Sequence, residues 1–265
     1  MDVKGKRIVL TGAAGGIGAA CATRLAAGGA RLLLVSRNAR RLEGLSAGLP
    51  GEGHLAVAAD LTSEAGRLAV VDACGGDIDV LINNAGINHF GLLETQSEAQ
   101  LREMFEINAL APILLTRMLL PDLRQRPSAV VNVGSGFGSI GFAGYCGYSA
   151  SKFALRGFTE ALRREVADTS VEVLYLAPRA TVTDMNPQSV VALNLELGNA
   201  MDPPERVASE LMTLLRKTGS ARYIGWPERF FVRLNAIFPS LVDRALASQL
   251  PVIRKQALAA VAGER

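Results

Sequence analysis

Short apolar runs recur along most of the chain, and segments with the apolar spacing of helices lie between them. Most runs are apolar at successive positions, so both faces of such strands would be covered by other elements. The runs lie at residues 7–10, 31–35, 54–58, 79–82, 128–133, 171–176 and 222–225. The helical segments lie at residues 17–27, 39–49, 63–73, 97–120, 146–167 and 203–217. This alternation indicates a parallel sheet with helices on both sides.

The domain organisation follows from the same pattern, because no linker or low-complexity segment interrupts it before residue 225. We predict an α/β protein with a three-layer, doubly wound Rossmann fold and a seven-stranded, mainly parallel sheet. Residues 1–225 would form this nucleotide-binding domain and contain the active site. Residues 226–265 would form a C-terminal helical extension that belongs to the same domain and does not fold independently.

A glycine-rich turn, residues 11–18, joins the first strand to the first helix. Its glycines would let the backbone turn sharply and approach a pyrophosphate, whose charge would sit at the positive N-terminus of the helix. The spacing T-G-x-x-x-G-x-G differs from the common G-x-G-x-x-G, and a glycine-rich turn without a ligand is the alternative. The position between a strand and a helix favours a dinucleotide site.

The end of the second strand predicts which dinucleotide binds. A site for NAD would place Asp or Glu there, whereas this chain has Ser36, Arg37 and Asn38, followed by Arg40 and Arg41. A carboxylate would repel a 2′-phosphate, and a guanidinium can bind one with two parallel hydrogen bonds. We therefore predict NADP(H) with Arg37 as its main contact. A solvated arginine at the start of a helix is the alternative.

Tyr148 and Lys152 are four residues apart in a predicted helix, so their side chains share one helix face. The unperturbed pKa of tyrosine is about 10, too high for proton transfer near neutral pH. A nearby cation favours the phenolate and would lower the pKa of Tyr148 toward the working range. The neighbouring Tyr145 has Ser149 rather than a cation at this spacing, which favours a pocket or core aromatic.

Several short motifs occur in order along this strand–helix pattern. They are Thr11-Gly12-x-x-x-Gly16-x-Gly18, Asp60-Leu61-Thr62, Asn83-Asn84-Ala85-Gly86, Asn108, Ser135 and Tyr148-x-x-x-Lys152. Together they resemble the short-chain dehydrogenase/reductase family, in its standard-length branch of single-domain enzymes. The resemblance covers roughly residues 4–225, and Ser135 precedes Tyr148 by 13 residues, as the family's catalytic serine does.

The resemblance implies a catalytic role for four residues. Tyr148 would be the general acid in reduction and the general base in oxidation. Ser135 would donate a hydrogen bond to the substrate oxygen. Lys152 would hold the nicotinamide ribose and tune Tyr148, and the backbone of Asn108 would bind a water linking Lys152 to solvent. The alternatives without a catalytic role are that Asn108 caps a helix turn and that Ser135 is an ordinary hydroxyl residue of a loop.

The resemblance also implies a cofactor-binding set. It comprises Gly12, Gly15, Gly16, Ile17, Gly18, Arg37, Asp60, Leu61, Asn84, Ala85, Gly86, Tyr148, Lys152 and Thr183. Asp60 would contact the adenine, Asn83 and Gly86 would shape the central strand of the site, and Thr183 would contact the nicotinamide carboxamide or the phosphates.

Two segments depart from the family pattern. Arg179 stands where the family usually has glycine after the sixth strand, and it would displace the adjoining loop or reach toward a negative charge on the substrate. The loop 134–138 around Ser135 carries more glycine than the family commonly shows, which would widen the mouth of the pocket.

The predicted substrate pocket is mostly apolar. Its expected borders are residues 88–90, Phe137, Phe142, Tyr145 and residues 185–197, the last forming a mobile helical lid. Such walls favour an apolar carbonyl or secondary alcohol, although a leucine-rich lid can also be simply packed. His89 could bind substrate, but a lone loop histidine is more often a bystander.

Residues 226–256 repeat large apolar side chains at helical spacing, with arginines between them, and Pro239 should break the helix. Three interpretations stay open: a helix packed on its own subunit or on a dimer partner, a hydrophobic gate over the pocket, or a peripheral contact with a membrane surface.

Composition excludes other classes of function. A net charge of +3 without a dense basic run argues against nucleic-acid binding. Three widely spaced cysteines indicate reduced thiols, and two histidines without partners at ligand spacing argue against a metal site. The basic start is followed by too short an apolar run for a signal peptide, and no uninterrupted run approaches the roughly 18 residues of a membrane span.

The sequence therefore predicts a cytoplasmic NADP(H)-dependent oxidoreductase, associated with a membrane surface if the extension binds one. It would transfer a hydride between the nicotinamide and a carbonyl or secondary alcohol, of an apolar or lipid-like substrate, with tyrosine as general acid/base. The resemblance implies a homodimer or homotetramer through residues 97–120 and 146–167. Epimerisation or dehydration on the same fold, and a non-catalytic cofactor-binding sensor, are the alternatives.

Overall fold

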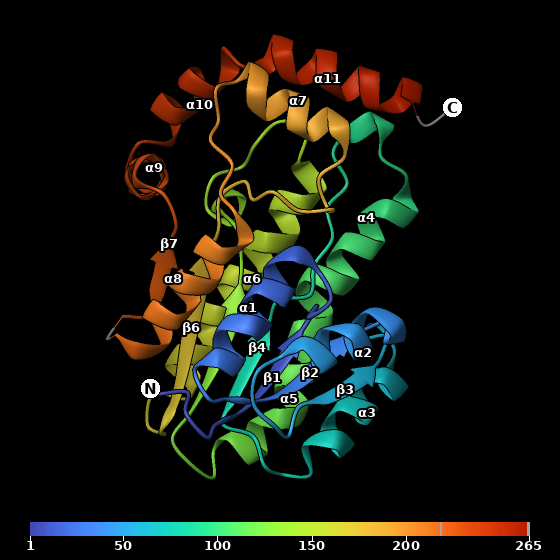
Figure 1. Cartoon of the computed structure of the whole chain (residues 1–265). Coiled ribbons are helices and arrows are strands. Elements are labelled where there is room, and N and C mark those ends of the chain that lie inside the picture. The colour runs from blue at the N-terminus through green and yellow to red at the C-terminus, as the bar shows by residue number, and fades with distance from the viewer. Residues whose placement is uncertain (218, 264–265) are drawn as a thin grey trace.

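The computed structural model describes residues 1–217 and 219–263 and contains a single seven-stranded sheet within them (Figure 1). Its strands are β1 (Arg7–Thr11), β2 (Arg31–Ser36), β3 (Leu55–Ala58), β4 (Val80–Asn83), β5 (Ser128–Val133), β6 (Val171–Ala177) and β7 (Ala221–Tyr223). The spatial order is β3-β2-β1-β4-β5-β6-β7, and every neighbouring pair is parallel. This confirms the predicted doubly wound fold and places its topological switch point between β1 and β4.

Helices cover both faces of the sheet. They are α1 (Gly16–Ala27), α2 (Ala39–Gly48), α3 (Glu64–Cys74), α4 (Glu98–Phe105), α5 (Ala111–Leu123), α6 (Cys146–Glu165), α7 (Gln188–Glu196), α8 (Pro204–Arg216), α9 (Trp226–Ile237), α10 (Pro239–Ala247) and α11 (Leu250–Gly263). Side chains of α1, α2 and α8 pack on one face, and side chains of α3, α5 and α6 pack on the other.

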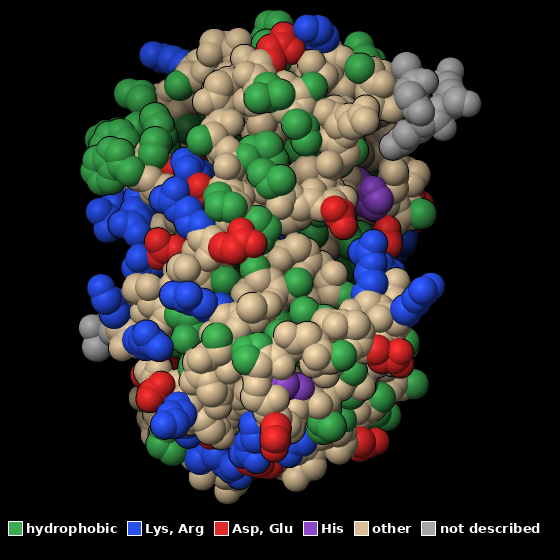
Figure 2. Space-filling view, in the orientation of Figure 1, with side chains coloured by type: hydrophobic (Ala, Val, Ile, Leu, Met, Phe, Trp, Pro, Cys, Tyr) green, Lys and Arg blue, Asp and Glu red, His purple; other side chains and the backbone are tan. Residues whose placement is uncertain are grey.

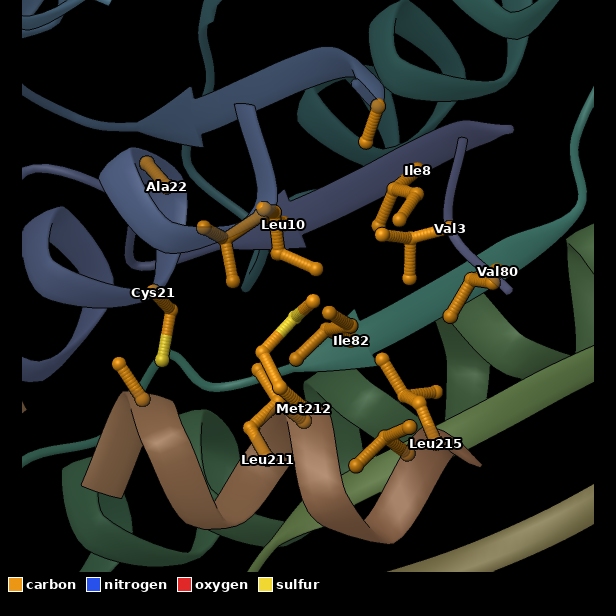
Figure 3. Close-up of a cluster of buried hydrophobic side chains, with 14 of the residues drawn as sticks. Val3, Ile8, Leu10, Cys21, Ala22, Val80, Ile82, Leu211, Met212 and Leu215 are labelled. Carbon is orange, nitrogen blue, oxygen red and sulfur yellow. The ribbon is translucent and has the colours of Figure 1, made fainter. Parts of the chain in front are cut away.

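The core explains why the strands are apolar at successive positions. Ile8 and Leu10 of β1 belong to the cluster on the α1–α8 side, whereas Val9 between them belongs to the cluster on the other side. Figure 3 shows the first cluster, where Leu10 lies near Met212 of α8 and all three strand residues have 0% exposure. Because a strand turns successive side chains to opposite faces, two covered faces require an uninterrupted apolar run.

The predicted helix over residues 97–120 is interrupted. Residues 106–110 form a π-helical turn between α4 and α5, and Asn108 lies in this turn. A π-turn inserts an extra residue into a helix, and such turns occur often at functional sites. The whole segment Glu98–Leu123 is long and apolar enough to cross a membrane by length and composition, but Leu115, Leu119 and Leu123 are buried in the core, as expected of a core helix.

The C-terminal segment forms α9, α10 and α11. The chain leaves the helical conformation at Phe238 and α10 begins at Pro239, so the predicted break is confirmed. Helix α11 lies along α7 (Figure 1): Ile253 shares a buried cluster with Leu193, and Lys255 forms an ion pair with Glu196 at 3.0 Å. Together α7 and α11 form a roof over the end of the sheet where the strands finish.

Candidate active site

A cavity of about 680 Å³ opens at the carboxyl ends of the strands. All of the predicted cofactor residues line it: Gly12, Gly15, Gly16, Ile17, Gly18, Arg37, Asp60, Leu61, Asn84, Ala85, Gly86, Tyr148, Lys152 and Thr183. Ser135 also lines it, whereas Asn108 is buried behind its wall. Residues from seven separated segments of the sequence are thus brought to one site, at the position where doubly wound sheets bind ligands.

The turn between β1 and α1 has a backbone that only glycine fits at two positions. Gly12 has φ +65°, and a Cβ atom there would lie 2.8 Å from the Cα atom of Ala85. A Cβ atom on Gly18 would lie 2.1 Å from the carbonyl oxygen of Gly12. Gly15, which has no side chain to cap the helix, precedes α1. The turn therefore leaves the helix N-terminus open to the cavity, an arrangement that fits a diphosphate.

Hydrogen bonds join this turn to the segment after β4. The hydroxyl oxygen of Thr11 accepts from the backbone N–H groups of Asn84 at 2.9 Å and Ala85 at 3.0 Å. In return, the side-chain amide of Asn84 donates to the carbonyl oxygens of Thr11 and Gly12 at 3.0 and 3.2 Å. Two of the sequence motifs are therefore parts of one rigid unit. Thr183 closes it from the other side, because a Cβ atom on Gly16 would lie 2.9 Å from its Cγ2 atom.

The rim of the cavity at the end of β2 is basic. Arg37 and Arg41 are both exposed and both line the cavity, so the structure adds Arg41 to the predicted contact. Hydrogen bonds from the backbone and hydroxyl of Thr62 hold the pKa of Asp60 below its usual value, and the charge of Arg37 has a smaller effect in the same direction. Asp60 is thus an ionised acceptor near Arg37.

Tyr148 and Lys152 both face the cavity from α6, and Ser135 faces it from the loop after β5. The Nζ atom of Lys152 lies 5.9 Å from the centre of the Tyr148 ring and donates a hydrogen bond to the carbonyl oxygen of Val133 at 3.1 Å. Lys152 is only 4% exposed, so this contact satisfies a cation that is largely removed from water.

The expected lowering of the pKa of Tyr148 by Lys152 is not found in this structure. Burial raises the pKa of Tyr148, and a hydrogen bond with Ser135 lowers it in part. Burial also lowers the pKa of Lys152 to about 8. The physical reason is that both groups lose their hydration, and the lysine amine is directed to the carbonyl of Val133 rather than to the phenol oxygen.

Asn108 supports the segment that lies between it and Lys152. Its side-chain oxygen accepts from the N–H of Ile87 at 2.8 Å, and its amide donates to the carbonyl of Ile87 at 2.9 Å and to the hydroxyl of Ser151 at 3.0 Å. A Cβ atom on Gly86 would lie 3.1 Å from the side-chain oxygen of Asn108 and 3.3 Å from the Nζ atom of Lys152. The π-turn thus places Asn108 directly behind the cavity wall at Lys152.

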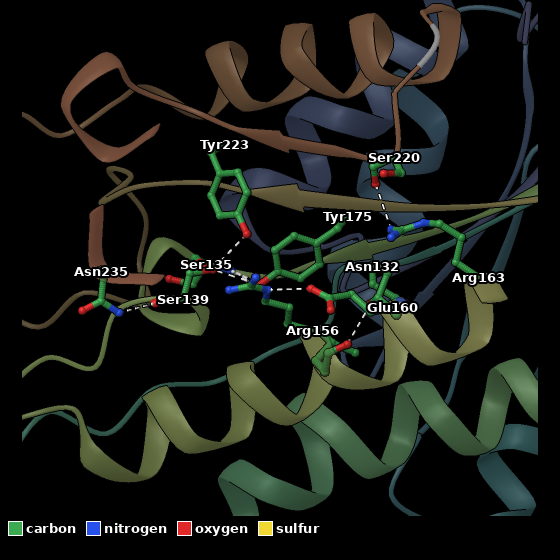
Figure 4. A network of polar contacts seen from close by, with 12 residues as sticks. Asn132, Ser135, Ser139, Arg156, Glu160, Arg163, Tyr175, Ser220, Tyr223 and Asn235 are labelled. Carbon is green, nitrogen blue, oxygen red and sulfur yellow. Dashed lines mark hydrogen bonds and ion pairs between the residues drawn. The ribbon is translucent and has the colours of Figure 1, made fainter. Parts of the chain in front are cut away.

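The ring of Tyr175 on β6 packs behind the Ser135 loop, and sequence reasoning missed it (Figure 4). Its hydroxyl oxygen accepts from the N–H of Ser135 at 3.4 Å. Cβ atoms on Gly134 and Gly138 would lie 2.0 and 2.6 Å from that oxygen. The expectation that these glycines widen the pocket mouth is therefore wrong for these two positions: they make room for a tyrosine on the side away from the cavity.

The Gly134→Ala variant is expected to lose stability by about 1–3 kcal/mol, the usual cost of overpacking, and to lower kcat. The added methyl group would displace either the Tyr175 ring or the backbone that carries Ser135. Chemical denaturation and steady-state kinetics measure the two effects. Gly157→Ala is the matched control, because nothing lies within 4 Å of a Cβ atom there. The double variant with Tyr175→Leu should regain part of both losses, and equal losses in single and double variants would contradict the packing argument.

Arg179 forms ion pairs within the protein. It donates to both carboxylate oxygens of Asp202 at 2.9 and 2.7 Å, and its third nitrogen lies 3.5 Å from Glu228 on α9. Asp202, which is 3% exposed, also accepts from Arg206 at 3.0 Å. Arg179 lines the cavity, but its charge is matched by these carboxylates. The guanidinium is therefore directed to groups of the protein, and not to a substrate anion as one of the two expectations had it.

Aromatic side chains form one wall of the cavity. Phe137, Phe142 and Tyr145 line it, and ring centres of Phe137 and Tyr145 lie 5.0 Å apart. His89 is not among the residues that line the cavity, and its Nε2 atom lies 3.1 Å from a carboxylate oxygen of Glu103. The far end is lined by apolar residues of the extension, of which Leu234, Val242 and Leu246 are examples. The helical spacing of these apolar residues was the feature of the sequence on which the interpretation of the extension as a hydrophobic gate over the pocket was based.

Comparisons with known proteins agree with these features. The model of a family described as short chain dehydrogenase matches residues 6–192. The chain is 34% identical over 273 residues to dehydrogenase/reductase SDR family member 7B of Bos taurus, and the match covers 96% of this chain and 84% of that protein.

Solved structures show the same fold with bound cofactors. A short chain dehydrogenase from Burkholderia cenocepacia J2315 in complex with NADP has a TM-score of 0.80 and 24% identity, over 93% of this chain and 99% of that one. The 3-ketoacyl-(acyl-carrier-protein) reductase from Brucella melitensis complexed with NADH has a TM-score of 0.75 and 27% identity, over 84% of this chain and 97% of that one. The first of these, at 24% identity, shows the shared fold, and the second, at 27% identity, supports a nicotinamide cofactor.

Proposed function

Because the chain belongs to the short-chain dehydrogenase/reductase family, we propose that it is an NADP(H)-dependent enzyme that interconverts an apolar carbonyl compound and the corresponding secondary alcohol. The family assignment makes it an oxidoreductase of the hydride-transfer class. The observation that carries the finer proposal is that Ser135, Tyr148 and Lys152 line the same cavity as the glycine turn and Arg37.

The chemistry of the site divides between the cofactor and three side chains. A nicotinamide bound in the cavity would supply or accept the hydride. Tyr148 gives a proton to the substrate oxygen in reduction and takes it in oxidation. Ser135 donates a hydrogen bond to the same oxygen and stabilises its developing negative charge. Lys152 keeps a cation close to the phenol ring, 5.9 Å from its centre, and so favours proton loss from Tyr148 when its amine turns toward the oxygen.

The region behind Tyr148 that we consider for proton supply contains the buried side chains of Asn108 and Lys152. Asn108 holds the backbone of Ile87 next to Lys152 through two hydrogen bonds, and this fixes the segment that separates the lysine from the π-turn. We assign to this region the path by which a proton reaches Tyr148 after each turnover. Tyr148 is half-buried at the cavity wall, and the polar groups behind it stay in contact with one another, which a proton relay requires.

The Arg37→Asp variant is expected to bind NADPH about 10- to 100-fold more weakly and to shift its preference toward NADH. The reason is the loss of charge-assisted hydrogen bonds to the 2′-phosphate and the added repulsion of a carboxylate. Fluorescence titration with both cofactors measures the change. Arg40→Asp is the matched control, since Arg40 is an exposed neighbour that does not line the cavity. An unchanged ratio of affinities in the Arg37 variant would refute the NADP assignment.

The substrate side of the cavity supports an apolar carbonyl compound. Its walls combine the rings of Phe137 and Phe142, which stack at 4.8 Å, with aliphatic side chains of α7, α9 and α10. A series of ketones of increasing chain length, followed through NADPH absorbance, tests this assignment. kcat/KM should rise with chain length, because each buried methylene contributes about 0.8 kcal/mol. A preference for short polar carbonyl compounds would contradict it.

We also propose that the chain forms a homo-oligomer through the α4–α6 face. The support is that α4, the π-turn after it and α6 carry exposed apolar side chains, among them Phe105, Leu110 and Phe153 at 43%, 41% and 41% exposure. Such side chains are typical of subunit interfaces when they share one face. Light scattering of the purified protein measures its mass in solution.

A further inference from the structure

The start of the C-terminal extension carries a dense group of exposed apolar side chains. We call it the C-terminal patch; it consists of Trp226, Phe230, Phe231, Ile237, Phe238 and Leu241, which are 77%, 53%, 43%, 68%, 58% and 56% exposed. Figure 2 shows hydrophobic side chains gathered over α9, with basic side chains just below them. Exposed apolar groups of this size mark interaction sites.

The patch follows from the helical spacing of α9. Trp226, Phe230 and Ile237 occupy positions i, i+4 and i+11, so they project from one side of the helix. Val232 on another side of α9 and Val242 of α10 are buried. The two helices are therefore anchored to the protein by one face and hold the patch outward on another.

The charges around the patch are mainly positive. Residues 226–256 contain five basic and two acidic residues. Arg229, Arg233 and Arg244 are exposed, and the Nε atom of Arg229 donates to the carbonyl of Tyr223. Of the two acidic residues, Glu228 lies 3.5 Å from Arg179 and is matched by it. Large apolar side chains bordered by arginines fit a negatively charged lipid surface, in which the rings enter the headgroup region and the guanidinium groups meet phosphates.

A second copy of the chain is a weaker candidate for this patch. The arginines beside it would face one another across a symmetric interface, because such an interface brings the same surface of both subunits together. The α4–α6 face, in contrast, offers exposed Phe105, Leu110 and Phe153 for self-association. From the apolar side chains and the charge around them, we infer that the C-terminal patch docks on an anionic phospholipid membrane surface.

The patch is continuous with the wall of the cavity. Phe231 and Leu241 are exposed at the surface and also line the cavity, next to the buried Val232 and Val242. Docking would therefore place the apolar end of the cavity beside the bilayer. On the proposed function, this means that an apolar carbonyl substrate with a long alkyl chain enters from the lipid phase, between α9 and α10, without crossing water.

Trp226 provides the direct test, because it is the single tryptophan of the chain and belongs to the patch. The full-length protein is mixed with vesicles of phosphatidylcholine and phosphatidylglycerol in equal parts. We expect the tryptophan emission to move to shorter wavelength and the protein to sediment with the vesicles, with weaker binding at high salt. Pure phosphatidylcholine vesicles should bind much less. Absence of binding to the anionic vesicles, or equal binding to both, would overturn the inference.

Two sets of variants locate the contact. Phe230→Ser, Ile237→Ser and Phe238→Ser combined should weaken vesicle binding about 100-fold or more, since three apolar side chains no longer enter the lipid. Arg233→Gln with Arg244→Gln should weaken it about 25-fold. Leu55→Ser with Leu68→Ser is the matched control, because these leucines are 47% and 44% exposed on β3 and α3. An equal loss in the control would also overturn the inference.

Two further outcomes separate the alternatives. If the patch joins two copies, the tryptophan emission and the mass in solution will change with protein concentration and not with vesicles, which contradicts membrane docking. The substrate route is tested by comparing a long-chain ketone held in anionic vesicles with a short, water-soluble ketone. The serine variant should lose turnover of the first at least about 10-fold and keep turnover of the second. If the wild-type protein reduces neither ketone, the proposed function fails, while vesicle binding still decides the docking.

Discussion

The Tyr148→Phe variant is expected to lower kcat by about 10³-fold and to leave the affinity for the cofactor almost unchanged. The phenylalanine ring keeps the packing of the half-buried tyrosine but removes the hydroxyl group that residue 148 would use for proton transfer, a step that contributes about 10²–10⁴ in rate. Stopped-flow and steady-state assays with a reducible ketone measure the loss, and fluorescence titration measures cofactor binding.

The control for this variant is Tyr145→Phe. Tyr145 lies close by, with its ring centre 6.1 Å from that of Tyr148, and it is 5% exposed in the aromatic wall. Because its hydroxyl has no assigned role in the chemistry, the loss should be below about 10-fold. A Tyr148 variant that keeps its turnover would remove the general-acid assignment. If the Tyr148 variant has no enzymatic turnover in the assay but still produces the full biological effect of the protein in cells, the alternative of a non-catalytic sensor is favoured.

The Lys152→Met variant is expected to lose at least about 10²-fold in kcat and to change how the stability of the cofactor-free protein depends on pH. Burial lowers the pKa of Lys152 from an ordinary 10.5 to about 8. Between these pH values the unfolded chain binds more protons than the native protein, so stability rises as pH increases through this interval. Below about pH 8 the amine is charged in both the native and the unfolded state, and its burial lowers the free energy of unfolding by about 3 kcal/mol.

Methionine removes the titrating amine, so the rise in stability between pH 8 and pH 10.5 should disappear in the variant. Loss of the hydrogen bond to Val133 offsets part of the gain below pH 8, and the slope is therefore the informative measurement. Urea unfolding at several pH values provides it. Lys4→Met, at an exposed lysine, is the control and should keep the wild-type slope. The same slope in the Lys152 variant would mean that another group titrates.

Much of the fold can be predicted from the sequence, because a strand that is buried on both faces appears as an uninterrupted run of apolar residues. All seven strands begin and end within two residues of the apolar runs, and β1 to β6 differ from them by at most one residue at either end. The π-turn at residues 106–110 was not predicted, since one additional residue does not disturb the apolar spacing of the long helix enough to be recognised. The break at Pro239 was predicted because proline cannot continue the hydrogen bonds of a helix.

The site divides in the same way. Residues at the ends of successive strands were predicted together, because parallel strands end at one edge of the sheet. Contacts between distant segments were not predicted. Tyr175 behind Ser135, and Asp202 and Glu228 around Arg179, depend on side chains that are 23 to 49 positions apart in the chain. The direction of the Lys152 amine was missed for a related reason: helical spacing places a side chain on a face and does not fix its rotamer.

The tyrosine wedged behind the serine loop has a consequence for how this protein could change over generations. Gly134 and Tyr175 form a mutually dependent pair, since a larger residue at position 134 is tolerated only after the ring at position 175 has become smaller. Gly138 stays restricted in either case, because a Cβ atom there would also lie 2.9 Å from the carbonyl oxygen of Lys152. The order of replacement therefore matters. If Tyr175 is exchanged first, Gly134 can follow, whereas exchange of Gly134 first gives a destabilised protein as the intermediate step.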